Sequence, residues 1–251
     1  MQNSNDMKQG TYDIEARVEA QHWWFCGRRQ LFASELHALK APIDAKFLDI
    51  GTGTVSKKRM LRHEGHRNVI GVDVDPLAIR YCLTKGFNSI LLAEATKLPF
   101  AEGQFDVVLG TDTVEHIEDD KSVLREIYRV LAPGGHIIIS VPAFPSLWGL
   151  QDDLAHHNRR YRPTDLTQKM RSSGLQIRRS YYFNFLLFVP ICLVRQFNRI
   201  VGIKLASENQ INSTVLDQLL FRIFSLGGTG TAPAIWRINY DAWAKDRRCS
   251  S

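Results

Sequence analysis

Two groups of ionisable side chains in this sequence are spaced so that they could act together in acid–base chemistry. In the first group, Asp112, Glu115 and His116 stand at positions i, i+3 and i+4, which share one face if the segment is helical. The second group comprises His156, His157, Arg159, Arg160 and Tyr161. A histidine titrates near neutral pH, and an arginine pairs a carboxylate or phosphate through two parallel hydrogen bonds. Both groups are therefore candidates for binding and deprotonating a substrate.

The first group has three interpretations. His116 could be a general base that a neighbouring carboxylate orients. The triplet Asp112, Glu115 and His116 could instead hold a divalent cation, because two carboxylates and an imidazole suit one. It could also be a structural Glu–His bridge where a helix begins. We expect His116 to be catalytic, and we expect no metal.

The second group could be a substrate-binding loop or a solvated basic loop whose arginines pair with Asp152 and Asp153. Trp148 and Tyr161 bracket the stretch with aromatic side chains, which favours substrate binding. We therefore predict that His156 and His157 act in catalysis. The predicted substrate contacts are Trp23, Trp24, Asp112, Trp148, Arg159, Arg160 and Tyr161, although Trp23 and Trp24 could equally be core.

A glycine-rich turn, Asp49-Ile50-Gly51-Thr52-Gly53, follows an apolar run and precedes a helical pattern. Glycines let the backbone approach a ligand closely. Asp73 ends the next apolar run, where its carboxylate can accept both hydroxyls of a ribose. The turn and this acid predict a ribose-containing cofactor. The fingerprint GxGxxG of nicotinamide enzymes is incomplete, because Ser56 occupies its third glycine position.

The elements that must position these residues follow from alternating apolar and amphipathic stretches. Strands are expected at 46–50, 69–74, 89–93, 105–110 and 136–141. Helices are expected between them, with a stop at Pro133-Gly134-Gly135. A helix at 163–173, a strand at 175–182, a helix from about 214 and an extended stretch at 234–244 complete the pattern. Strands alternating with helices predict crossover connections, and hence a parallel sheet covered on both faces.

The order of these motifs resembles that of the class I S-adenosylmethionine (SAM)-dependent methyltransferases. Shared with them are the acid and GxG after the first strand, the acid after the second, Glu94-Ala95 before Leu98-Pro99-Phe100, Phe105-Asp106-Val107-Val108, and Leu131-Ala132-Pro133-Gly134-Gly135. The resemblance covers about Phe47 to Val141. Outside it, His22-Trp23-Trp24-Phe25 with Arg28-Arg29, and Leu147-Trp148 with the later Arg159-Arg160-Tyr161, resemble a bacterial subgroup of the superfamily.

This resemblance implies a Rossmann-like, doubly wound sheet of seven mostly parallel strands with helices on both faces. It implies SAM as the cofactor. Residues 1–45 would form a helical lid segment. Residues 46–251 would form the cofactor-binding domain, with substrate-loop insertions around 142–162 and 183–230.

The resemblance also assigns cofactor contacts position by position. Gly51, Thr52 and Gly53 would line the methionine part, Asp73 the ribose, and the Glu94-Ala95 pair the adenine edge. The full expected set is Arg28, Asp49, Gly51, Thr52, Gly53, Asp73, Val74, Glu94, Ala95 and Thr111. Val55 departs from the family pattern, which usually has another glycine there, so its branched side chain could crowd the turn.

Composition and net charge limit the kinds of partner that we expect this protein to bind. A net charge of +6 over 251 residues, without a basic tail, predicts no nucleic-acid partner. The scattered cysteines form no CxxC pair, which favours a reducing cytoplasm. The apolar stretch Phe185–Val194 is too short to span a bilayer, although peripheral contact through 181–200 stays open. A monomer or homodimer is expected.

The predicted function is methyl transfer from SAM to a hydrophobic or anionic small molecule, with O-methylation favoured. One alternative is an RNA or protein methyltransferase. Against it, no Asn/Asp-Pro-Pro-Tyr motif follows the fourth strand. A second alternative is a catalytically silent binding or scaffold protein, which Val55 and the C-terminal segment keep open.

Overall fold

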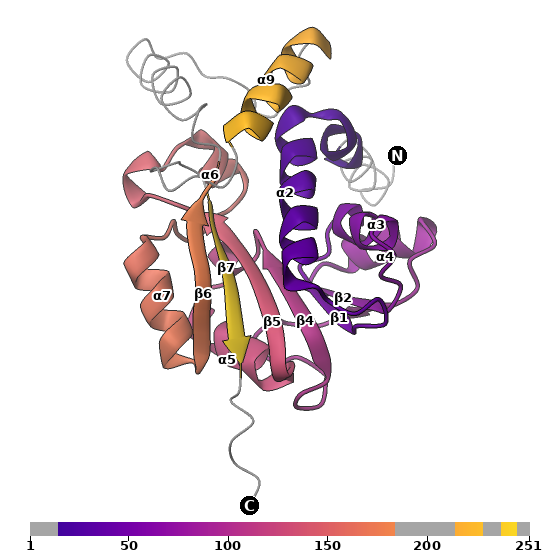
Figure 1. Cartoon of the computed structure of the whole chain (residues 1–251), viewed down its shortest axis with the longest axis vertical. Helices are drawn as coiled ribbons and strands as arrows, with labels where there is room; N and C mark the ends of the chain where they lie inside the picture. Colours follow the sequence, from indigo (N-terminus) through magenta and orange to yellow (C-terminus); the bar gives the residue numbers. More distant parts are fainter. Residues whose placement is uncertain (1–14, 184–213, 228–236, 245–251) are drawn as a thin grey trace, which may run out of the picture.

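The apolar runs fold as neighbouring strands of one sheet in the computed structural model, which describes residues 15–183, 214–227 and 237–244 (Figure 1). The strands are β1 (Phe47–Ile50), β2 (Val69–Asp73), β3 (Ile90–Leu92), β4 (Phe105–Thr111), β5 (Leu131–Pro142), β6 (Leu175–Tyr182) and β7 (Arg237–Ala244). Their order across the sheet of the described residues is β3-β2-β1-β4-β5-β7-β6. Strands β1 to β5 pair in parallel, and β7 runs antiparallel to both β5 and β6.

Helices connect and cover these strands. They are α2 (Trp23–Leu39), α3 (Ser56–His63), α4 (Pro76–Thr84), α5 (Asp120–Val130), α6 (Leu150–Leu154), α7 (Pro163–Ser172) and α9 (Thr214–Gly227). Two 3₁₀ turns, η1 (Val114–His116) and η2 (Pro145–Leu147), follow β4 and β5. The α/β, Rossmann-like fold with a parallel core that the sequence predicts is confirmed.

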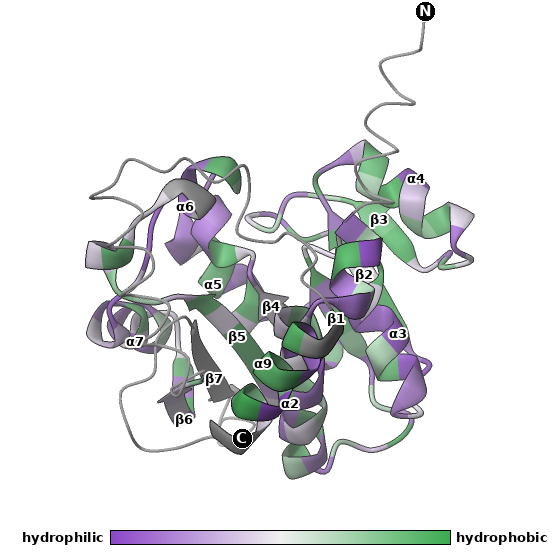
Figure 2. Ribbon diagram, turned by 90° about the horizontal axis from the view of Figure 1, so that it is seen from above, coloured by the Kyte–Doolittle hydropathy of each residue, from purple (hydrophilic) through white to green (hydrophobic). Residues whose placement is uncertain are grey.

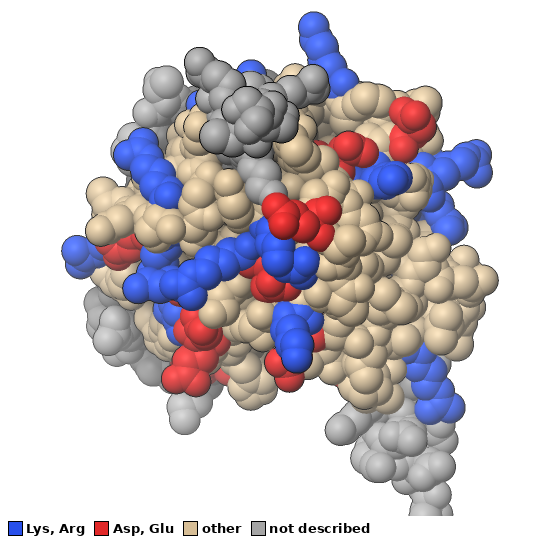
Figure 3. Space-filling model, turned by 90° about the horizontal axis from the view of Figure 1, so that it is seen from below, with Lys and Arg blue, Asp and Glu red and all other residues tan. Residues whose placement is uncertain are grey.

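Side chains alternate along the strands, so each face of the sheet packs its own layer of helices. On one face, Phe47 and Leu109 pack with Phe32 and Leu36 of α2. On the other face, Leu48 packs in a cluster with the buried residues of α5 and α7. Figure 2 shows hydrophobic residues concentrated in the strands and many hydrophilic ones on the outer helix α3. On the face that Figure 3 shows, basic and acidic side chains are interspersed.

The turn expected at Pro133-Gly134-Gly135 lies inside a strand. Helix α5 ends at Val130, and β5 begins directly at Leu131, which pairs with Phe105. The register between β4 and β5 then shifts between Phe105 and Val107. The prediction that the fifth strand begins at His136 is therefore wrong, because the backbone of the turn is accommodated as a strand irregularity.

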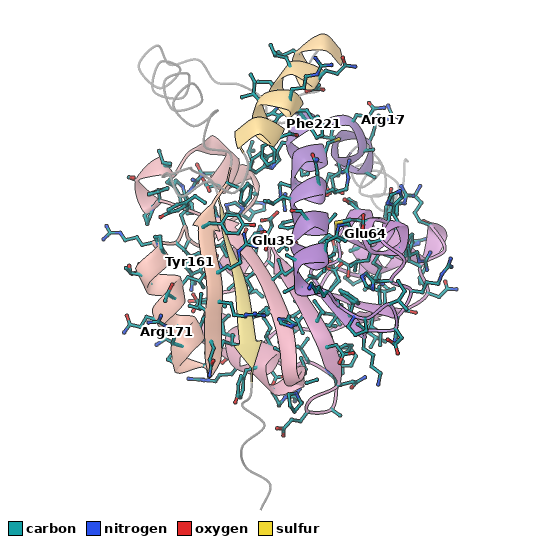
Figure 4. The ribbon with its side chains drawn as sticks, viewed as in Figure 1. Arg17, Glu35, Glu64, Tyr161, Arg171 and Phe221 are labelled. Carbon is teal, nitrogen blue, oxygen red and sulfur yellow. The ribbon has the colours of Figure 1, made fainter. Side chains whose placement is uncertain are left out.

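Helix α2 follows the N-terminal helical segment and contacts β6, which lies at one edge of the sheet. Residues 15–21 form a further helical turn, and the Nδ1 atom of His22 accepts a hydrogen bond from the backbone N–H of Trp24 where α2 begins. Glu35 of α2, which is labelled in Figure 4, accepts hydrogen bonds from two residues of β6: Tyr181 Oη at 2.6 Å and Arg179 Nη1 at 3.1 Å. These contacts fix α2 across the sheet.

Several sequence predictions fall outside the described residues: the N-terminal start 1–11, the apolar stretch Phe185–Val194 and most of the insertion 183–230. Residues 234–236 of the expected last strand do so as well. Among the helices that the structure describes, none combines the length and apolar character needed to cross a membrane.

Candidate active site

A cavity of about 1110 Å³ lies beside the carboxyl ends of β1, β2 and β4. Ligands bind at this edge in open parallel sheets, because the loops that follow the strands diverge there. Helix α2 supplies Phe25, Arg28, Arg29 and Phe32 to its wall, and residues 15–21 supply Glu15 and Glu19. The cavity therefore lies between the sheet edge and the N-terminal helices.

The glycine turn forms the floor of one half of the cavity. Gly51 and Gly53 have φ angles of 69° and 55°, in the left-handed region that favours glycine. A Cβ atom on Gly51 would lie 2.5 Å from Oγ1 of Thr113, whereas one on Gly53 would meet none of the described residues within 4 Å. Gly51 is thus needed for packing beneath the turn, and Gly53 leaves open space at the cavity.

Asp73, at the end of β2, has a second role that sequence reasoning missed. Its Oδ2 accepts a hydrogen bond from the backbone N–H of Gly53 at 2.9 Å, and its Oδ1 accepts one from the backbone N–H of Asp75 at 2.9 Å. Asp73 lines the cavity, so the same carboxylate braces the turn and faces a ligand. Asp75 then caps α4, accepting from the N–H of Leu77 at 2.9 Å.

Asp49 does not line the cavity, and its expected cofactor contact is corrected. Its carboxylate is fully buried and pairs with Lys57 Nζ at 2.8 Å. Burial raises the pKa of Asp49, while the Lys57 ammonium opposes that rise. Lys57 itself lines the cavity and donates to the carbonyl of Gly51 at 2.8 Å. Asp49 thus supports the turn from below through Lys57.

Val55 adopts a left-handed backbone conformation, with φ 65° and ψ 2°, where α3 begins. A branched residue is strained in this conformation. Its side chain is 1% exposed and packs in the cluster of Tyr81, Cys82 and Phe87. The side chain therefore does not crowd the turn at the cavity, because it packs against residues of α4 and does not line the cavity.

The remaining expected cofactor residues lie around the same cavity. Val74, Glu94 and Ala95 line one end, after β2 and β3. Thr111 lies at the end of β4, and its buried Oγ1 has no hydrogen-bond partner among the described residues. On α2, Arg28 is buried and donates to Asp112, while its Nε atom is likewise unpartnered in the described part of the chain. Burial lowers the pKa of Arg28 to about 10.

Three side chains converge at the other end of the cavity: Glu115, His116 and His157. Each offers one nitrogen or oxygen atom within 4.8 Å of the others, and the two imidazole centroids are 4.8 Å apart. Burial raises the pKa of Glu115 to about 7, and both of its oxygens lack a hydrogen-bond partner among the described residues. Burial, reinforced by His157, lowers the pKa of His116. The cluster can accept or store a proton.

The loop between β5 and α7 reaches this cluster because Asn158 pins it to η1. The N–H of Asn158 donates to the carbonyl of Glu115 at 2.8 Å, and Nδ2 donates to that of His116 at 2.8 Å. His116, His156 and His157 all line the cavity. The structure therefore brings the two sequence groups together, with His157 where the sequence placed Asp112. Asp112 is instead bonded to Arg28 and Ser140.

The predicted substrate contacts of Arg160 and Tyr161 are corrected. The Arg160 guanidinium is buried and pairs with Asp152 at 2.7 Å through both Nε and Nη2. Tyr161 is 2% exposed and donates to Asp120 Oδ2 at 2.8 Å. Neither lines the cavity, because each compensates a buried carboxylate on a neighbouring element.

Four other predicted substrate contacts also lie away from the cavity lining. Arg159 pairs with Asp120 at 3.0 Å, and the Trp148 indole donates to Asp153 at 2.8 Å. Trp23 and Trp24 pack in an aromatic cluster with Phe183 and Phe224. This is the core alternative that the sequence left open for the tryptophans.

Sequence reasoning missed Glu15, Glu19 and Lys57 at the cavity. Thr54 Oγ1 donates to the Glu19 carboxylate, and Arg29 donates to the Glu19 carbonyl. These bonds hold the helical turn 15–21 over the glycine turn. The i, i+4 spacing of Glu15 and Glu19 was the available signal, since it places both carboxylates on one helical face.

The parallel sheet, the glycine turn and the ribose-type acid define a nucleotide-binding α/β domain of the class I methyltransferase type. Residues 48–139 match the family described as "Methyltransferase domain". Residues 48–139 therefore form a class I SAM-dependent methyltransferase domain, and SAM is the cofactor of that family. The predicted family and cofactor are confirmed.

Individual relatives match over part of their length. The chain is 35% identical over 113 residues to a demethylmenaquinone methyltransferase of Thermus thermophilus, covering 43% of this chain and 50% of that protein. It is 33% identical over 102 residues to the chloroplastic tocopherol O-methyltransferase of Arabidopsis thaliana, covering 38% and 29%. The chain thus spans about half or less of these relatives. A geranyl diphosphate methyltransferase in complex with SAM has the same fold, with a TM-score of 0.56, 13% identity and 85% of each chain covered.

Proposed function

We propose that this protein transfers a methyl group from SAM to a small-molecule acceptor, with a hydroxyl as the favoured acceptor group. The observation that carries the proposal is the single cavity that joins the glycine turn at one end to the histidines at the other. A volume of about 1110 Å³ exceeds the roughly 300–1,000 Å³ of a pocket for one drug-sized ligand. The cavity has room for a cofactor and an acceptor together.

The residues of the first half fit SAM. The open space at Gly53 admits the methionine part, and the carboxylate of Asp73 can accept the ribose hydroxyls. The Nε atom of Arg28, which has no hydrogen-bond partner among the described residues, offers a buried donor to the carboxylate of SAM. Glu94 and Ala95 lie where the adenine edge would end. We assign these residues, together with Thr52, Val74 and Thr111, to cofactor binding.

When bound, SAM supplies an electrophilic methyl group on sulfur, so much of the rate can come from positioning the acceptor in line with it. What the chain must add is a place for the acceptor's proton. His116, His156 and His157 line the acceptor end of the cavity. An acceptor that loses a proton during transfer, such as a hydroxyl, needs a base of this kind, and this favours O-methylation.

The proposed function divides the chain into a lid segment and a catalytic domain. Residues 1–45 act as a lid, with α2 and the turn 15–21 forming one wall of the cavity. Residues 46–251 form the catalytic domain, in which the loop around 142–162 carries acceptor-binding residues. The scattered cysteines favour a cytoplasmic location, and we expect a monomer or homodimer.

The test is formation of S-adenosylhomocysteine by purified protein incubated with SAM and small-molecule extracts, followed by mass spectrometry of the methylated product. We expect turnover with a fraction that contains hydroxylated or acidic metabolites. The Asp73→Ala variant is the matched control, because it removes the ribose contact. Turnover only with an RNA or protein fraction would replace the small-molecule assignment. Absence of turnover with every fraction would favour a silent binding protein.

A further inference from the structure

Asp152 is a buried carboxylate with an unusual number of donors around it. Its Oδ1 accepts from Arg160 Nε at 2.7 Å and lies 2.9 Å from His157 Nδ1. Its Oδ2 accepts from Arg160 Nη2 at 2.7 Å and from the N–H of Gly149 at 2.9 Å. Asp152 is 0% exposed. Together these contacts hold the carboxylate in one orientation.

The charges around Asp152 fix which nitrogen of His157 carries a proton. Burial alone would raise the pKa of Asp152, but hydrogen bonds from His157 and Arg160 outweigh burial and lower it to about 2. An ionised carboxylate only accepts hydrogen bonds, so Nδ1 of His157 must be the donor. In the neutral ring, Nε2 is then left with its lone pair.

Glu115 and His116 also lie beside the His157 ring. The three residues each place an atom within 4.8 Å of the others, and the Glu115 carboxylate is fully buried without a hydrogen-bond partner among the described residues. A carboxylate at this distance would offset the charge of an imidazolium that formed on His157. His157 and His116 both line the cavity, whereas Glu115 and Asp152 lie behind them.

Resting on the function proposed above, we propose that Asp152 and Glu115 are positioning residues that hold His157 as the proton acceptor of methyl transfer. The acceptor's O–H bond breaks as an N–H bond forms at Nε2 of His157. The acceptor oxygen forms the new O–CH₃ bond while the S–CH₃ bond breaks. The electron pair of the broken S–CH₃ bond stays on sulfur. Water at the cavity later takes the proton from the imidazolium. Arg160, which the sequence assigned to the substrate, instead keeps Asp152 ionised.

Asp152→Asn tests the proposal without a known acceptor. The amide oxygen of the new side chain belongs at the Oδ2 position, because two fixed donors, Gly149 N–H and Arg160 Nη2, meet it there, against one, Arg160 Nε, at Oδ1. Its NH₂ group would then face His157 Nδ1 and force the proton onto Nε2. Nitrogen-15 NMR of histidine-labelled protein distinguishes the two tautomers, and His157→Gln identifies the His157 signal. We expect the Nδ1–H form in the wild type and the Nε2–H form in the variant.

The matched control is Asp153→Asn. Asp153 neighbours Asp152 and is exposed, and in the described part of the chain its carboxylate accepts a hydrogen bond from the Trp148 indole. This control should keep the wild-type tautomer and the wild-type kcat. Asp152→Asn should lower kcat by about 10²–10⁴-fold, as loss of a positioned base does, with KM and SAM affinity within about threefold of wild type.

The outcomes separate this inference from the proposed function. If wild-type protein makes S-adenosylhomocysteine but Asp152→Asn keeps its tautomer or its kcat, the inference is wrong and the function stands. If the wild type makes none with any acceptor, the function fails, and the tautomer still decides whether Asp152 orients His157. If Asp152→Asn does not fold, Glu115→Gln replaces it: kcat should fall at least tenfold with the Nδ1–H tautomer retained, and an unchanged kcat overturns the proposal.

Discussion

Arg28 of the lid helix donates a hydrogen bond to Asp112, which directly follows β4 on the cavity floor. Ser140 of β5 donates to the other oxygen of Asp112 at 2.9 Å. Asp112 has a φ of 54°, a strained conformation that these two bonds help to hold. The lid, β4 and β5 thus meet at one carboxylate beside the proposed cofactor carboxylate site.

Arg28→Met should weaken SAM binding at least tenfold, because a charge-assisted hydrogen bond contributes about 1.5–3 kcal/mol. Isothermal titration calorimetry measures the change. Arg59→Met, on an exposed position of α3, is the control. Since removing one partner of a buried pair is itself destabilising, the double variant Arg28→Met/Asp112→Asn should recover thermal stability without recovering SAM affinity. Recovery of both would show that Arg28 acts only as a fastening for the lid.

Asp73→Ala should weaken SAM binding by more than tenfold, since it removes the ribose acceptor and the brace on Gly53 together. Asp73→Asn keeps an acceptor oxygen and should lose less affinity. Calorimetry measures the SAM affinity of both variants. Asp44→Ala, at an exposed position, is the control. Equal affinity for wild type and Asp73→Ala would remove Asp73 from the cofactor site.

Val55→Gly should leave SAM affinity unchanged or slightly higher, because the Val55 side chain does not reach the cavity. Thermal unfolding provides the sharper measurement. Away from positive φ, Ala is more stable than Gly by about 0.5–1 kcal/mol. At the φ of 65° found here, Val55→Gly should melt above Val55→Ala, since glycine relieves the backbone strain. The opposite order would mean that packing against Tyr81 and Phe87 outweighs that strain.

Glu115→Gln should raise stability at alkaline pH. Because the pKa of Glu115 in the folded protein, about 7, exceeds its ordinary value of 4.5, the folded state binds more protons than the unfolded state between these values. The stability contribution of Glu115 therefore falls as pH rises through this window, by at most about 3 kcal/mol. The Tm gain of the variant should be larger at pH 8 than at pH 5. The exposed Glu118→Gln is the control, and a gain that does not depend on pH would contradict the prediction.

Chelation should leave turnover unchanged. Asp112, one member of the triplet that could have held a cation, is bonded to Arg28 and Ser140. Dialysis against EDTA followed by the S-adenosylhomocysteine assay checks this. Activity that EDTA abolishes and Mg²⁺ restores would reassign Glu115, His116 and His157 from proton transfer to metal binding.

The sequence predicted the parallel core, and the loops that follow β1, β2 and β3, from local signals. Apolar runs bounded by turn residues mark β1 to β4, and the ordered motifs from Asp49 to Phe100 place the loops after them. The end of α5 was the exception. Proline and glycine indicate a turn locally, but pairing of Leu131 with Phe105 draws the same residues into β5.

The acceptor end was predicted only in part, because its contacts join residues far apart in sequence. Arg160 and Tyr161 have the chemistry of an anion site, yet Asp152 and Asp120 compensate them in the folded chain. No local spacing indicates that Asn158 fastens the loop to Glu115 and His116. The sequence thus identified candidate residues for the acceptor end of the cavity, but it could not predict which of them contact one another.

The order of strands also has a consequence for engineering. The proposed cofactor contacts follow β1, β2 and β3 on one side of β4, whereas His156 and His157 lie on the loop that follows β5 on its other side. Grafting the 142–162 loop of another protein of this fold would exchange the acceptor half and leave the donor half intact. A graft must retain a donor to the backbone carbonyl of Glu115, which the N–H of Asn158 provides in this loop. The segment at the end of β4 cannot be exchanged in the same way. Thr111 and Asp112 border both the cofactor half and the acceptor half of the cavity, so changing them would alter both.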